Sequence, residues 1–169
     1  MAIYGEGAGD FGTLVDLTWD HGGSDGDWST ANWVVGPPSV PDTTVDALLN
    51  NGATVTVATA GQTAYNLTID NGTVAVTSGA DLSVSRTISV AETTGELSVA
   101  NLGTINAQTV ETAGTTTFDA GSAGAVGALN LRGGVTTISS PIVDSVDARA
   151  GTLQLGADVN VLHVFDAAV

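Results

Sequence analysis

GATVTV at residues 52–57 and GTVAV at residues 72–76 open a series of six segments in which a glycine precedes a short strand that alternates apolar with polar residues. The other members are GELSV (95–99), GTTTF (114–118), GVTTI (134–138) and GTLQL (151–155). Their glycines are 20, 23, 19, 20 and 17 residues apart. A repeat near 20 residues, built of strands and turns with no helical segment between them, predicts a β-solenoid.

A second family of strands alternates with the first. Its members are NLTID (66–70), TISVA (87–91), QTVET (108–112), LNLRG (129–133), VDARA (146–150) and LHVFD (162–166). The predicted inward pairs are Leu67/Ile69, Ile88/Val90, Gln108/Val110, Leu129/Leu131, Val146/Ala148 and Leu162/Val164. Each coil therefore carries at least two strands, and NLGTINA (101–107) leaves room for a short third.

These patterns predict an all-β chain folded as a single-stranded parallel β-helix of about six coils. One coil cannot bury its apolar face alone, but coils stacked about 4.8 Å apart pair every strand with its neighbours and line up internal side-chain ladders. Coils of irregular length near 20 residues favour a right-handed helix. The Asn51-Gly52 and Asn71-Gly72 steps would supply the positive φ angles that the corners need.

An N-terminal cap, residues 1–42, is expected to precede a solenoid of residues 43–169. The cap holds all three tryptophans, Trp19, Trp28 and Trp33. Large aromatic side chains at the end of a solenoid seal its core against water. Clustered indole rings also suit stacking on a sugar, so a carbohydrate- or surface-binding module remains an alternative function.

Residues 18–57 resemble the opening of the repeat regions in large bacterial surface proteins of the autotransporter-adhesin type. The matching elements are Trp19, Gly22–Gly23, Trp28-Ser29-Thr30-Ala31-Asn32-Trp33, Pro41-Asp42 and Gly52–Val57. The resemblance implies a capped β-helix on an exported surface protein, and it carries no catalytic residues.

The composition narrows the classes of partner and compartment. Eighteen acidic residues face three arginines, and the net charge of −15 repels nucleic acids and anionic lipids. No cysteine is present, and no apolar run approaches the ~18 residues of a membrane-spanning helix. Residues 1–12 lack the basic and apolar regions of a Sec signal peptide. The acidic ending Asp166-Ala167-Ala168-Val169 is similar to that of type I secretion substrates, so we expect an extracellular or cell-surface protein.

Candidate chemistry is sparse, and the chain is predicted not to be an enzyme. GGSDGD (22–27) is similar to a calcium-binding glycine-rich repeat, and Asp20, Asp25 and Asp27 could place oxygen atoms around one Ca²⁺; no other cofactor is expected. His21 and His163 lie far apart in the sequence, with no cysteine to complete a zinc site and no nucleophile motif nearby. A polysaccharide-active enzyme remains a minor alternative, although the acidic residues are scattered.

Two further patterns concern the outer surface. Ice binding, another minor alternative, would need a regular threonine column, and the outward column here reads Thr56, Ala75, Ser98, Thr117, Thr137 and Gln154. Glu111 and Arg132 follow inward residues in successive coils, which predicts an ion pair between them.

The two ends of the predicted rod suggest assembly. A solenoid end without a cap exposes strand edges and an apolar cross-section. We therefore expect an exported structural protein that assembles head-to-tail with itself into filaments or forms an adhesin stalk. The residues expected at the assembling ends are Ile3, Tyr4, Phe11 and Leu14 at one end and Leu162, Val164, Phe165 and Val169 at the other.

Overall fold

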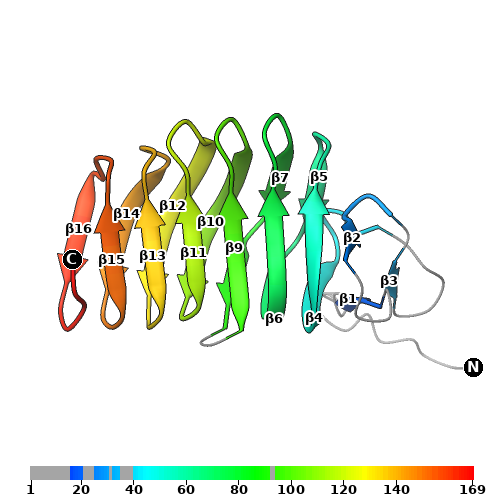
Figure 1. Cartoon of the computed structure of the whole chain (residues 1–169), viewed down its shortest axis with the longest axis horizontal. Helices are drawn as coiled ribbons and strands as arrows, with labels where there is room; N and C mark the ends of the chain where they lie inside the picture. Colours follow the sequence, from blue (N-terminus) through cyan, green and yellow to red (C-terminus); the bar gives the residue numbers. More distant parts are fainter. Residues whose placement is uncertain (1–15, 21–24, 31, 35–39, 92–93) are drawn as a thin grey trace, which may run out of the picture.

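The computed structural model describes residues 16–20, 25–30, 32–34, 40–91 and 94–169. Within this part of the chain the structure is all-β and contains no helix. The strands stack as a β-solenoid of about six turns, which confirms the predicted fold. Figure 1 shows the coils side by side along the long axis, with β1–β3 at one end and β16 at the other.

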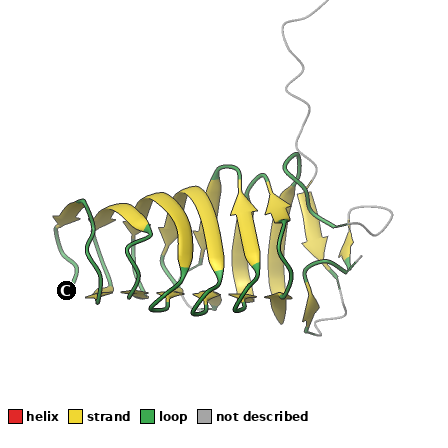
Figure 2. Ribbon diagram, turned by 90° about the horizontal axis from the view of Figure 1, so that it is seen from above, coloured by secondary structure: helices red, strands yellow, loops and turns green. Residues whose placement is uncertain are grey.

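Each coil has three faces, A, B and C, named here by their strands. Face A consists of β1 (Asp16–Trp19), the first parts of β4 (Asp46–Val57) and β6 (Leu67–Val76), β8 (Thr87–Val90), the second parts of β10 (Thr104–Thr112) and β12 (Ala123–Leu131), β14 (Val143–Ala148) and β16 (Val161–Val164). Face B consists of β2 (Gly26–Asp27), the second parts of β4 and β6, β9 (Gly95–Val99), β11 (Thr115–Phe118), β13 (Val135–Ile138) and β15 (Thr152–Leu155). Face C is shorter and consists of β5 (Gln62–Ala64), β7 (Asp81–Val84) and the first parts of β10 and β12. Figure 2 shows the strands of successive coils joined by loops along the whole row.

The parallel register confirms the two strand families and the third strand at residues 104–106. On face B the predicted outward column is continuous, because Thr56 pairs with Ala75, Ala75 with Ser98, and so on to Gln154. The period-two alternation of side chains carries this register from coil to coil.

Most predicted inward residues are buried, with two kinds of exception. The buried residues of the face A columns are Leu67, Ile69, Ile88, Val90, Val110, Leu129, Leu131, Val146 and Ala148. Gln108 is exposed, so its inward prediction is wrong. It lies at the corner between faces C and A, where the register passes from Ala107–Val126 to Thr109–Ala128. Leu162 and Val164, on the last coil, each remain 40% exposed because no further coil covers them.

The glycines that begin the face B strands mark the corner between faces A and B. Gly52 and Gly72 have φ angles of 81° and 128°, which confirms the predicted positive φ at the Asn-Gly steps. Gly95 and Gly114 do not have positive φ angles. At Gly114 a Cβ atom would lie 2.2 Å from the carbonyl oxygen of Ala91, so close contact with the neighbouring coil requires glycine there.

Residues 16–34 continue the solenoid and then close it. Strand β1 pairs in parallel with β4 on face A, and β2 pairs in parallel with β4 on face B. Strand β3 (Trp33–Val34) then pairs with β1 in the antiparallel direction, through Thr18–Val34 and Trp19–Trp33. The outer edge of face A is therefore covered by a reversed strand at the N-terminal end.

The predicted ion pair between Glu111 and Arg132 does not form. Glu111 pairs in register with Asn130, whose Nδ2 donates a hydrogen bond to Glu111 Oε1 at 3.5 Å. Arg132 lies two residues further on, beyond the end of β12, so the two side chains are offset along the strand direction. Within the described residues the ion pair that forms joins Arg149 and Asp147, at 2.9 Å.

Candidate functional site

The three tryptophans form one buried cluster at the N-terminal end. Trp28 and Trp33 are fully buried and Trp19 is 1% exposed. The ring centroids of Trp19 and Trp33 lie 5.2 Å apart in an edge-to-face arrangement, and those of Trp28 and Trp33 lie 4.7 Å apart. Trp33 Nε1 donates a hydrogen bond to the Trp28 carbonyl oxygen at 3.1 Å. This arrangement suits a plug over the end of the core, and it leaves no ring face exposed for stacking on a sugar.

The three aspartates predicted to bind calcium serve different local contacts. Asp25 Oδ1 accepts a hydrogen bond from Thr54 N at 2.6 Å and so ties the loop to β4. Asp27 Oδ1 accepts hydrogen bonds from Ser29 N and Ser29 Oγ, at 2.8 and 2.5 Å. The backbone N–H of Asp20 donates to the Asn32 carbonyl. Among the residues that the structure describes, no group of three or more histidine, cysteine or acidic residues is arranged to hold a metal ion.

The histidines lie apart from any catalytic arrangement that can be recognised in the described residues. His21 falls outside those residues. His163 is exposed on β16, in register with Asp147. The pKa of the Asp147 carboxyl is lowered from its ordinary value of 3.8, chiefly by its hydrogen bonds with Arg149, with smaller electrostatic contributions from Arg132 and His163. These groups form an exposed charged patch around the Arg149–Asp147 pair.

Of the residues predicted at the assembling ends, the C-terminal set is described and Ile3, Tyr4, Phe11 and Leu14 fall outside the described residues. Phe165 and Val169 are 65% and 67% exposed, and Arg149 lies over the Phe165 ring at 5.3 Å. The backbone of Ala168 bonds to Gly151 and Leu153, which covers part of the free edge of β15 on face B. The outer edge of β16 on face A pairs with no other strand of the described chain.

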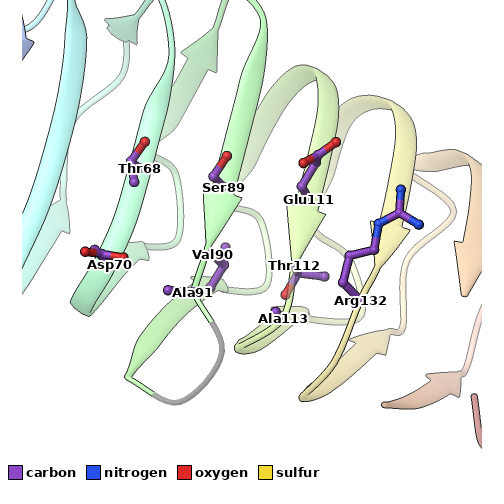
Figure 3. Close-up of a pocket in the computed structure, with 9 residues that line it drawn as sticks. All are labelled: Thr68, Asp70, Ser89, Val90, Ala91, Glu111, Thr112, Ala113 and Arg132. Atoms are coloured by element: carbon purple, nitrogen blue, oxygen red, sulfur yellow. The ribbon is translucent and has the colours of Figure 1, made fainter. Parts of the chain in front are cut away.

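A hollow of about 210 Å³ lies on the outside of face A, where the chain turns toward face B. Figure 3 shows Thr68, Ser89 and Glu111 in a row across β6, β8 and β10, with Arg132 at the end of the row. The remaining lining residues are Asp70, Val90, Ala91, Thr112 and Ala113. The sequence analysis missed this hollow, although the outward positions of the second strand family predict its polar row.

The fold defines the chain as a parallel β-solenoid closed at its N-terminal end by a tryptophan cluster. Comparisons with protein-family models, curated proteins and solved structures found no match, so the adhesin resemblance of residues 18–57 receives no support from them. A search of the described residues for a helix long and apolar enough to cross a membrane found none.

Proposed function

We propose that this chain is a non-enzymatic structural protein of the bacterial surface or extracellular matrix, in which the rod itself is the working part. Solenoid coils extend by adding further coils, and a rod of this kind separates or links the structures at its two ends. The acidic composition and the adhesin-like residues 18–57 support an exported protein.

The contrast between the two ends carries the proposal. At the N-terminal end the tryptophan cluster is buried and β3 covers the edge of β1. At the other end, Leu162 and Val164 stand in register with Val146 and Ala148, which are 1% and 0% exposed. One more β-coil laid against β16 would bury Leu162 and Val164 in the same way and would pair the free backbone groups of the strand.

A second copy of this chain is the proposed source of that coil, added head-to-tail. Strand β3 opposes the simplest form of this contact, because a stacked copy needs the outer edge of β1 that β3 occupies. Head-to-tail growth therefore requires β3 to move aside, and growth should be slow at its first step. A coil supplied by a longer polypeptide would instead form a continuous stalk.

Electron microscopy and sedimentation velocity of the purified chain over a wide concentration range test this proposal. Filaments, or particles whose mass grows with concentration, support it. The double variant Leu162→Asp and Val164→Asp should abolish growth. Leu102→Asp changes another exposed apolar residue, 65% exposed in a loop, and should leave growth unchanged. A discrete dimer would overturn the head-to-tail form, and a monomer at all concentrations would overturn self-association.

A further inference from the structure

The hollow on face A has a regular row of hydrogen-bonding side chains along one side. Thr68 pairs in register with Ser89, and Ser89 pairs with Glu111. Asn130 and Asp147 continue the same outward column on β12 and β14. Successive coils lie about 4.8 Å apart, so this column presents one polar side chain at each such step along the rod. A linear ligand parallel to the rod axis would meet them one after another.

The other side of the hollow is apolar. Ala91 and Ala113 follow β8 and β10 at the corner, beside the mostly buried Val90. Binding sites for organic ligands combine an apolar lining with a few polar groups that fix orientation. A ligand that fits this lining has an apolar surface on one side and hydroxyl groups along its edge, as a sugar ring does.

The charges of the hollow select the type of sugar. The carboxylates of Asp70 and Glu111 are exposed at the hollow, and the chain carries a net charge of −15, so both features repel an anionic polymer. Carboxylates are good acceptors for sugar hydroxyl groups. The hollow therefore suits a neutral ligand rich in donors.

Arg132 supplies a donor at the end of the row. Arg149 is paired with Asp147, and Arg86 lies over the Tyr65 ring at 5.4 Å. Arg132, in contrast, makes no hydrogen bond, ion pair or ring contact within the part of the chain that the structure describes. Its exposed guanidinium keeps its N–H donors available for ligand oxygens.

From these features we propose that the hollow on face A binds a neutral polysaccharide chain lying parallel to the rod axis. Asp70, Ser89 and Glu111 accept hydrogen bonds from its hydroxyl groups, and Arg132 donates to its oxygens. The proposal is independent of self-association, because all of these residues belong to internal coils of one chain.

Affinity electrophoresis of the folded chain in gels containing dextran, galactomannan, xylan or polygalacturonate tests this site. We expect at least one neutral polysaccharide to retard the protein, and Arg132→Gln to weaken that binding about tenfold or more, the usual effect of losing a charge-assisted hydrogen bond. Arg86→Gln makes the same charge change at the other edge of face A and should leave the retardation unchanged. Circular dichroism checks that both variants stay folded.

Several outcomes would overturn the proposal. These are no retardation in any neutral gel, equal effects of Arg132→Gln and Arg86→Gln, or retardation by polygalacturonate alone. Shortening of the polysaccharide during incubation would show that the carboxylates catalyse hydrolysis, and it would replace the binding role with an enzymatic one.

Discussion

Replacing Gly114 with alanine tests why glycine recurs at the corner between faces A and B. An added Cβ would lie 2.2 Å from the Ala91 carbonyl oxygen and 2.3 Å from that of Gly95, whereas ordinary contacts begin near 3.4 Å. Both obstacles are backbone atoms of the adjacent coil, which cannot rotate away as a side chain could. The two coils must therefore separate locally by about 1 Å.

The expected cost follows from the hydrogen bonds that this movement strains. Ala113 N and Gly114 N both donate to the Val90 carbonyl, at 2.8 and 3.3 Å, and Val135 N donates to the Gly114 carbonyl at 3.1 Å. Losing about 1 kcal/mol for each bond, and adding about 1–3 kcal/mol for overpacking, predicts that Gly114→Ala lowers the free energy of unfolding by roughly 3–5 kcal/mol.

Gly61→Ala is the matched control. Gly61 has a φ of +80°, but nothing lies within 4 Å of its added Cβ. This variant should lose only about 1–2 kcal/mol, the cost of a left-handed conformation for a residue with a side chain. Both substitutions restrict the unfolded chain alike, so their difference isolates the steric term.

Urea unfolding followed by far-ultraviolet circular dichroism measures both free energies. The three tryptophans all lie in the N-terminal cap, so a coincident fluorescence transition would show that the cap and the coils unfold together. If Gly114→Ala is no more destabilising than Gly61→Ala, the steric explanation of the glycine column is refuted.

Three further predictions concern the cap, the acid range and a strained loop. Trp28→Phe should cost less in unfolding free energy than Trp33→Phe, because Trp28 Nε1 has no partner in the described structure whereas Trp33 Nε1 bonds to a buried carbonyl; the urea midpoints of the two variants decide this. Hydrogen bonds from the Thr44 hydroxyl and backbone N–H lower the pKa of Asp42 below 3.8, so its contribution to stability is present above that pH and is lost as the pH falls through the folded-state pKa; Thr44→Val should raise this pKa toward 3.8 in a carboxyl NMR titration. Leu102 has a φ of 63° and is 65% exposed, so Leu102→Gly should raise the melting temperature by relieving about 1 kcal/mol of backbone strain, and an unchanged or lower melting temperature would contradict this.

Sequence reasoning recovered the coil register because each strand buries alternate side chains. The outward column from Thr56 to Gln154 follows directly from that alternation. It failed at Gln108, because a corner residue breaks the alternation while the strand continues on both sides. The predicted contact between Glu111 and Arg132 failed for a related reason: equivalent places near a strand end can differ by two residues along the strand.

The hollow on face A could be predicted only in part. Its polar row, Thr68, Ser89 and Glu111, occupies outward positions that the pattern identifies. Its apolar side needs Ala91 and Ala113 brought together at a corner, and no local pattern indicates how far a corner recedes from the strand beside it. The predicted calcium aspartates show the converse, since their closeness in sequence does not join them into one site in the described structure.

The sequence by itself determined the solenoid, since burial of alternate apolar residues and a glycine every 20 residues or so are local requirements that each coil repeats. Only the tertiary structure decided why Gly95 and Gly114 must be glycine, because the atoms that exclude a side chain belong to neighbouring coils. It also decided that the three tryptophans are buried under a reversed β3, and that Leu162 and Val164 lie uncovered. A residue's partners in the next coil lie about 20 positions away, and stacking alone determines which atoms meet there.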